Sequence, residues 1–178
     1  MSYEYSEDNL IEQTAMELFY DHLDWDTAIA FNKETYGPDG TLGRSSRKEI
    51  ILRPRLVSKL KEFNPGLPEK AYTDAIDKLL EYSVTRSLAE INYDKYQLLR
   101  DGIPVEYVNE RGERIKNKKL RVFDFGSPSR NDFLAVRQMW ICGRSKRERR
   151  PDIIGFVNGI PLLFVELKAA HVKLEKAY

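Results

Sequence analysis

The sequence predicts a mixed α/β fold, in which helices come first along the chain and a strand-rich sheet follows. Before Gly102 the apolar residues recur at helical spacing, whereas after it short apolar runs lie between turn signals. The chain has 178 residues, of which 42% are hydrophobic and 32% charged, a balance typical of a folded domain with its own core. We therefore expect one domain over residues 1–178, mostly helical over 1–102 and strand-rich over 103–178.

Prolines and glycines delimit the expected helices. A first helix is predicted from about residue 7 to residue 21, where apolar residues follow a 3.6-residue period. Pro54 can open a second helix, which Asn64-Pro65-Gly66 ends, and Pro68 can open a third. A fourth helix ends near Gly102, because glycine is favourable just after a helix.

Strands are expected wherever short apolar runs lie between turn signals. Asn158-Gly159 is a strong hairpin signal, and the consecutive apolar residues on either side indicate two strands with both faces covered. A final helix is expected to begin near Lys168. The expected strands are 25–32, 103–108, 120–125, 133–141, 153–157 and 162–167, and glycines mark a loop at 37–43.

The net charge of +1 hides an asymmetry between the two parts of the chain. Residues 1–110 contain 13 basic and 21 acidic side chains, whereas residues 111–178 contain 16 basic and 7 acidic ones. Such a basic part is typical of a protein that meets a polyanion, although a solvated basic loop fits the composition equally well. The densest basic cluster is Arg144, Lys146, Arg147, Arg149 and Arg150.

Composition and motifs exclude several classes of protein. The single cysteine, Cys142, excludes an internal disulfide framework and a cysteine-based zinc site, and it suits a reducing cytoplasm. No apolar run approaches the roughly 20 residues of a membrane span. The acidic N-terminus does not look like a secretory signal. No phosphate-binding P-loop motif is present, so we expect no ATPase motor in this sequence.

Three ionisable residues lie at the ends of the two most apolar strands. Asp152 precedes one strand of the predicted hairpin, and Glu166 and Lys168 end the other. Ionised groups in such positions are costly unless they are paired or bind a metal. Two carboxylates with waters and phosphate oxygens are a common Mg²⁺ site, and a lysine can stabilise developing negative charge. The alternative interpretation is a turn cap at Asp152 and an ordinary ion pair between Glu166 and Lys168.

The spacing of the hairpin makes a geometric prediction. A strict two-residue turn at Asn158-Gly159 would place Asp152 opposite Val165, and Glu166 would then point to the other face of the sheet. A three-residue connection, with Gly159 in the left-handed conformation of a bulge, places Asp152 opposite Glu166. We therefore expect a bulged turn, or an equivalent irregularity near Asp152, with both carboxylates in reach of one ion.

The Pro-Asp and Glu-Leu-Lys segments resemble a known family, the N-terminal endonuclease domain of the restriction (motor) subunit of type I restriction-modification enzymes. That family belongs to the PD-(D/E)xK nuclease superfamily, so the resemblance implies a mixed central sheet flanked by helices, a restriction-endonuclease-like core. The similar segments are Ser6–Gln13, Leu42–Glu49, Asn64-Pro65, Tyr96–Leu99, Asn131–Leu134, Gln138–Ile141, Arg150–Leu162 and Val165–Lys168.

The resemblance implies specific roles for site residues. Asp152 and Glu166 would bind Mg²⁺, and Lys168 would complete the phosphodiesterase site. Many superfamily members place another carboxylate on the first helix, for which Glu12 is the first candidate and Glu7 the second. The alternative for Glu12 is a solvated helix face. Family members also have a Gln and a Tyr on a later helix, and Tyr178 should not be given that role.

The resemblance also implies a function and partners. We expect a Mg²⁺-dependent endonuclease domain that hydrolyses double-stranded DNA after motor-driven translocation, in a prokaryotic cytoplasm. The partners would be DNA, ATP-dependent motor domains of the same, longer polypeptide, and separate methyltransferase and specificity subunits. One alternative is a catalytically silent DNA-binding or subunit-docking module with the same fold. Another is a nuclease that acts on RNA or single strands, because phosphate contacts do not distinguish these substrates.

Overall fold

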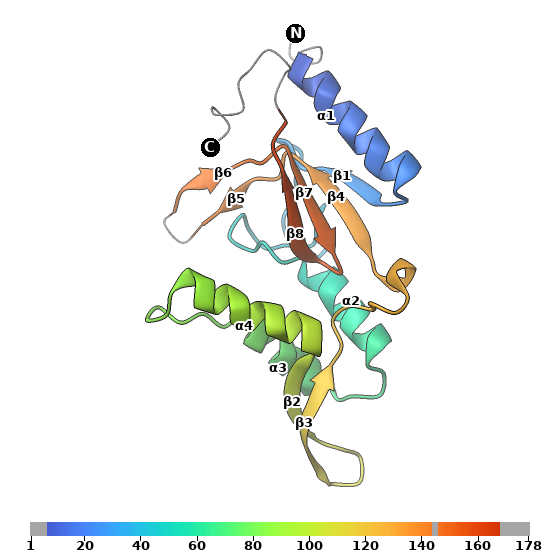
Figure 1. Cartoon of the computed structure of the whole chain (residues 1–178), viewed down its shortest axis with the longest axis vertical. Coiled ribbons are helices and arrows are strands. Elements are labelled where there is room, and N and C mark those ends of the chain that lie inside the picture. Colours follow the sequence, from blue (N-terminus) through green and yellow to red (C-terminus); the bar gives the residue numbers. More distant parts are fainter. Residues whose placement is uncertain (1–6, 144–145, 168–178) are drawn as a thin grey trace. The chain divides into compact units, whose positions relative to one another are not determined.

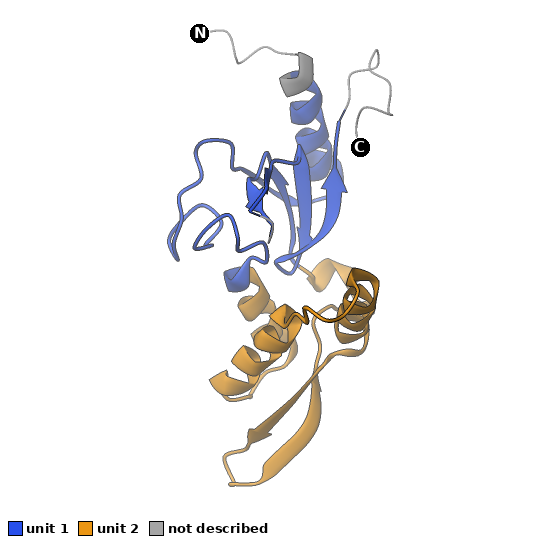
Figure 2. Ribbon diagram, turned by 90° about the vertical axis from the view of Figure 1, so that its left-hand side faces the viewer, with its two compact units in different colours: residues 1–54, 132–178 blue, residues 55–131 orange. Residues whose placement is uncertain are grey.

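The computed structural model describes residues 7–143 and 146–167, with backbone alone for residues 7–9. The chain forms two compact units, coloured separately in Figure 2. Unit 1 comprises residues 1–54 and 132–178, and unit 2 comprises residues 55–131. The single domain expected over the whole chain stays a prediction. Across the described segments, no helix is long and apolar enough to cross a membrane.

Unit 1 is built on a mixed four-stranded sheet in the order β1-β4-β7-β8 (Figure 1). β1 pairs parallel with β4, whereas β4–β7 and β7–β8 are antiparallel. This architecture confirms the predicted mixed α/β fold. The elements of the sheet and its short companion sheet are β1 (Asp26–Ile29), β4 (Phe133–Arg137), β7 (Ile153–Val157), β8 (Ile160–Val165), β5 (Ile141–Cys142) and β6 (Glu148–Arg149).

One face of this sheet packs against the first helix, α1 (Glu7–Glu17), which continues into a short π-helix, Leu18–His22. Met16 and Phe19 of this segment form a core with Ala135 and Ile153 of the sheet. Trp25 also packs here, and its ring lies so close to Gly155 that a Cβ atom there would meet it at 3.0 Å. Glycine in β7 therefore makes room for the aromatic layer beneath α1.

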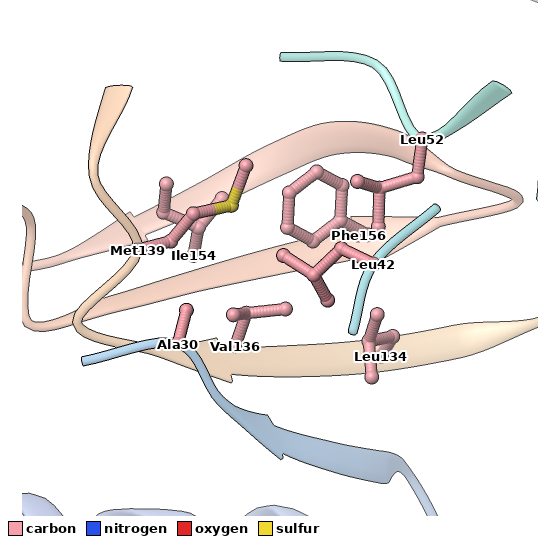
Figure 3. Packing of buried hydrophobic residues seen from close by; sticks show 8 residues of the cluster. All are labelled: Ala30, Leu42, Leu52, Leu134, Val136, Met139, Ile154 and Phe156. Atoms are coloured by element: carbon pink, nitrogen blue, oxygen red, sulfur yellow. The ribbon is translucent and has the colours of Figure 1, made fainter. Parts of the chain in front are cut away.

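The opposite face packs against the irregular segment between β1 and the next helix (Figure 3). Leu42 and Leu52 from this segment are buried against Leu134, Val136 and Phe156 of the sheet. In addition, the backbone N–H of Leu52 donates to the carbonyl of Gly159 at 2.8 Å. Both faces of the central strands are therefore covered, one by a helix and the other by an irregular segment.

A buried ion pair organises that irregular segment. The Arg44 guanidinium is fully buried and binds both carboxylate oxygens of Glu34, at 2.5 and 2.6 Å. The same guanidinium donates to the carbonyl of Trp140 at 2.7 Å and lies over the Tyr36 ring. A buried arginine is tolerated here because its donors are satisfied by a bidentate carboxylate and by backbone oxygen.

Unit 2 consists of three helices and a two-stranded antiparallel ribbon (Figure 1). Val105 of the ribbon is buried, as are Ala71 and Ala75 of α3. The last helix has a capping box, in which Ser87 and Glu90 bond each other's backbone N–H groups. The elements are α2 (Arg53–Phe63), α3 (Glu69–Leu80), α4 (Leu88–Asp101), β2 (Ile103–Val108) and β3 (Arg114–Leu120).

Two strand predictions were wrong in extent. The strand expected over 120–125 lies earlier, at β3, and the following residues are irregular because Asn64 and Asn131 side chains bond the backbone there. The strand expected over 133–141 ends at Arg137, because Gln138 has a left-handed backbone with φ of 53°. The helix expected from Lys168 lies outside the described residues.

The prediction that both hairpin strands have covered faces holds for β7 alone. Every residue of β7 except Val157 is buried. β8 lies at the edge of the sheet, and Leu162 and Phe164 are each 53% exposed. An apolar run indicates a strand, but the position of that strand in the sheet decides which faces are covered.

Candidate functional site

The β7–β8 register ends one residue short of both Asp152 and Glu166. The turn at Asn158-Gly159 has two residues, both with positive φ, so the expected three-residue connection is wrong. A bulge in β8 then shifts the register: Phe156 pairs with Pro161, but Gly155 pairs with Leu163. The last pair is Ile153 with Val165, and the next residue outward is Asp152 on one strand and Glu166 on the other, as the predicted register beside Asp152 requires.

The extra residue of this bulge is Leu162, which the register leaves without a partner on β7. The need to bring two carboxylates together predicts the register beside Asp152. The irregularity was expected in the turn, where Gly159 suits a left-handed bulge position, or near Asp152. The turn instead adopts the two-residue form that suits the twist of the strands, and the shift occurs within β8.

A hydrogen bond ties Asp152 to the segment after β8. The backbone N–H of Leu167 donates to Oδ2 of Asp152 at 2.6 Å. Leu167 directly follows Glu166, so this contact holds the chain beside Glu166 close to the aspartate. Asp152 is half-buried and Glu166 is exposed, which leaves the carboxylates accessible from solvent. Lys168 lies outside the described residues, and its role stays a prediction.

Asp152 is also fixed from the other side by β4. The backbone N–H of Gln138 donates to the Asp152 carbonyl at 2.8 Å and extends the β4–β7 ladder by one residue. The side chain of Gln138 donates from Nε2 to both carboxylate oxygens of Glu12, at 2.8 and 2.7 Å. The left-handed backbone at Gln138 therefore allows one residue to link α1 with the site strand.

Glu12 is 5% exposed, so the alternative of a solvated helix face is wrong. Its carboxylate accepts from Arg137 Nε at 2.6 Å as well as from Gln138. No group of three or more carboxylate, histidine or cysteine side chains within the described residues could hold a metal. Glu12 as a metal ligand stays a prediction, as does Glu7, whose side chain is outside the described part.

The donor set fits Mg²⁺ by its chemistry. Asp152 and Glu166 supply hard carboxylate oxygens from adjacent strand ends, and Mg²⁺ is usually bound through one or two carboxylates, with water and phosphate oxygens completing the shell. The Asp152 carbonyl accepts a hydrogen bond from Gln138 of the neighbouring chain segment, which fixes the backbone that carries this carboxylate. A Mg²⁺ ion held by two carboxylates keeps coordination positions that water or a phosphate oxygen can fill.

The basic cluster surrounds the β5–β6 hairpin of unit 1. Arg149 lies on β6 opposite Ile141, and Lys146 and Arg147 lie in the turn between the strands. All of its described members are exposed, as phosphate contacts require. The Arg150 guanidinium lies 4.6 Å from the Phe31 ring centroid and 5.2 Å from that of Trp140. Arg144 is outside the described residues.

Sequence reasoning missed Arg47, which lies beside this hairpin. Its carbonyl accepts from the Cys142 N–H at 2.8 Å, and its guanidinium binds Glu148 at 2.7 Å. Hydrogen bonds to Tyr36 and Glu148 raise the pKa of Arg47. Sequence reasoning also missed Arg137 and Gln138. The place of Gln138 in the Gln138–Ile141 segment could have drawn attention to it, but Arg137 lies just before that segment.

Comparisons with known proteins agree with the resemblance drawn from the sequence. A family model described as type I restriction enzyme R protein N terminus matches residues 4–178. The chain is 36% identical over 161 residues to the type I restriction enzyme HindI endonuclease subunit of Haemophilus influenzae, covering 90% of this chain. It is 29% identical over 133 residues to a putative type I restriction enzyme MjaIXP endonuclease subunit of Methanocaldococcus jannaschii, covering 71% of this chain. The matched regions span 15% and 12% of those two proteins.

Proposed function

Because the chain belongs to the family of type I restriction enzyme R protein N-terminal regions, we propose that it is a Mg²⁺-dependent endonuclease domain that hydrolyses phosphodiester bonds of double-stranded DNA. The observation that supports this most directly is the hydrogen bond from Leu167 N–H to Asp152. It holds Leu167, the residue after Glu166, against the aspartate of the Pro-Asp segment. The relatives are named endonuclease subunits, which agrees with this reaction.

Each residue of the site has a distinct proposed task. Asp152 and Glu166 would hold the ion, which when bound polarises a phosphoryl oxygen and lowers the pKa of a bound water. Lys168 would stabilise the negative charge that develops on the phosphate oxygens. Gln138 holds the backbone of Asp152 in place through its N–H group. Glu12 of α1 accepts hydrogen bonds from the side chains of Gln138 and Arg137, so α1 helps to position the backbone of the site through Gln138.

The basic cluster would bring DNA to these carboxylates. Lys146, Arg147 and Arg149 are exposed and can contact backbone phosphates without reading bases. This suits an enzyme whose sequence recognition belongs to another subunit. The proposal therefore includes ATP-dependent motor domains in the longer polypeptide, and methyltransferase and specificity subunits in the complex.

Substitution of the carboxylates in the complete enzyme tests the proposal. Asp152→Asn and Glu166→Gln should each lower the rate of DNA cleavage by about 100-fold or more, because each removes a metal ligand used in the transition state. DNA binding and motor-driven ATP hydrolysis should persist. The matched control is Asp39→Asn, which makes the same chemical change at an exposed loop position of unit 1.

A titration of Mg²⁺ separates the metal site from a purely structural role. Cleavage should stop on chelation and return with Mg²⁺, and the two variants should need more Mg²⁺ than the control to reach half of their maximal rates. Wild-type cleavage by Asp152→Asn at the same Mg²⁺ requirement would reject the site. A complex that binds DNA but never cleaves it would favour a silent docking module instead.

A further inference from the structure

Unit 2 contains a second basic run that the candidate active site does not use. Residues 111–121, which include β3, contain six basic residues and a single acidic one, Glu113. The basic cluster of unit 1 has five basic residues and one acidic residue over 144–150. The second run is thus at least as basic as the first, and it lies in the other unit. Its basic residues are Arg111, Arg114, Lys116, Lys118, Lys119 and Arg121.

The lysines of β3 differ from the other lysines of unit 2 in their contacts. Lys59, Lys61 and Lys70 each form an ion pair with a nearby carboxylate. Two further lysines, Lys78 and Lys95, donate to backbone carbonyls.

Lys116, Lys118 and Lys119 are exposed, and none of them forms an ion pair with any residue the structure describes. The exception on this strand is Arg114, which binds Glu106 of β2 at 2.9 Å. The pKa of the Asp101 carboxyl is lowered mainly by Arg100 and further by the nearby charge of Lys119, whereas Lys116 and Lys118 have no such carboxylate among the described residues.

A bulge spreads these charges over both faces of the ribbon. Val105 pairs with Lys118 and Tyr107 with Ile115, so β3 has one extra residue in between. The extra residue is accommodated at Asn117, whose backbone is left-handed with φ of 55°. Because opposed residues share a face, Lys118 lies on the face of Val105, whereas Lys119, opposite Pro104, lies on the other.

The exposed lysines of β3 suit one kind of partner. The ribbon packs within unit 2 through Val105 and Leu120, which are buried, so the exposed lysine side chains are the part of it that is available to a ligand. Every ionisable side chain of β3 is basic, which suits phosphate contacts that do not depend on base sequence. Duplex DNA has regularly spaced phosphates along its backbone, so the ribbon is complementary to it in charge.

We propose that the β2–β3 ribbon binds the phosphate backbone of double-stranded DNA, as a contact separate from the candidate active site. The inference rests on the proposed function only in taking duplex DNA as the ligand. The competing explanation is that lysines on an exposed edge strand prevent it from pairing with another chain. That explanation predicts self-association when the lysines are removed, and no effect on DNA.

Two double variants with equal changes in net charge test the proposal. Lys116→Gln with Lys118→Gln removes two unpaired charges of the ribbon, and Lys61→Gln with Lys70→Gln removes two ion-paired charges of α2 and α3. Binding of the intact chain to a 30-base-pair duplex is followed by fluorescence anisotropy, without divalent metal, over a range of salt concentrations. Omitting the metal makes the measurement independent of cleavage.

The ribbon variant should reduce the slope of log affinity against log salt by about 1.8, since each lost phosphate contact releases about 0.9 fewer counterions. The control variant should keep the wild-type slope. Equal slopes for the two variants would overturn the proposal, as would self-association of the ribbon variant with an unchanged slope. A reduced slope for the ribbon variant, combined with no DNA cleavage by the complete enzyme in Mg²⁺, would reject the proposed nuclease activity. It would leave the proposed DNA binding by the ribbon intact.

Discussion

The two units differ in where their charged side chains are paired. Unit 1 contains two buried networks, Arg44 with Glu34, and Glu12 with Arg137 and Gln138. In unit 2 most ion pairs lie at the surface, and Lys116 and Lys118 of β3 have no carboxylate partner within the described residues. Buried networks fix the positions of other groups, whereas exposed charges remain available to a ligand.

This difference has an energetic consequence. An exposed ion pair contributes from nothing to about 1 kcal/mol, because solvent screens it and its side chains lose entropy. Removal of one partner of a buried pair leaves the other charge uncompensated in a medium of low dielectric constant. Removal of one partner of an ion pair should therefore lower the free energy of unfolding strongly in unit 1, where the pair is buried. It should lower it only slightly in unit 2, where the pair is exposed.

The largest effect on stability is expected for Arg44→Leu. Glu34 would lose its bidentate partner in a site where its side chain is 4% exposed, and the carbonyl of Trp140 would lose its donor. We expect the free energy of unfolding to fall by about 3–5 kcal/mol, measured by guanidinium chloride denaturation. The matched change in unit 2 is Arg86→Leu, which breaks the exposed pair with Asp94 and should lower the free energy of unfolding far less, because solvent screens that pair. Equal losses of stability in Arg44→Leu and Arg86→Leu would contradict the difference drawn between the two units.

A smaller difference is expected between two glycines. A Cβ atom on Gly155 of β7 would meet Leu163 Cβ and the Trp25 ring, both at 3.0 Å, so Gly155→Ala should cost about 1–3 kcal/mol. The control is Gly126→Ala in unit 2, whose Cβ would lie 3.7 Å from its nearest neighbour, Asp124. We expect that variant to stay within about 0.5 kcal/mol of wild type. A shift in near-ultraviolet circular dichroism from Trp25 should accompany the first change alone.

Much of this fold follows from local patterns in the sequence. Pro54 and Pro68 mark the starts of α2 and α3, and Gly102 marks the end of α4, because these residues act through the backbone alone. The two apolar strands β7 and β8 were also predicted. What local patterns could not predict is the exposure of Phe164, because burial of an edge strand depends on elements that are distant in the sequence.

The candidate site likewise combines features that local sequence patterns predict with features that depend on residues distant in the sequence. The Pro-Asp and Glu-Leu-Lys segments identify Asp152 and Glu166, and the need to oppose them predicted the register of the hairpin beside Asp152. The position of the bulge at Leu162 depends on how β8 packs, which the spacing does not contain. The partnership of Glu12 with Gln138 joins residues 126 positions apart, so only the folded structure places them together.

The smallest predicted effect concerns the capping box of unit 2. Ser87→Ala removes the side chain that caps α4 and should lower the free energy of unfolding by about 1 kcal/mol. Ser83→Ala is the matched control, because Ser83 lies in an exposed turn before the helix and bonds only to Thr85 there. This variant should be close to wild type in stability.

The effect of Ser87→Ala should also depend on pH. Hydrogen bonds from the Ser87 side chain and backbone lower the pKa of Glu90 below its ordinary value of 4.5. A carboxyl with a lowered pKa in the folded state stabilises that state above its ordinary pKa, and the contribution is lost as the pH falls through the folded pKa. The wild type and Ser87→Ala should therefore differ most in stability near neutral pH, and the difference should shrink below about pH 4. Thermal unfolding at pH 7 and pH 3 measures this, and a difference that is constant across the range would mean that Glu90 takes no part in the cap.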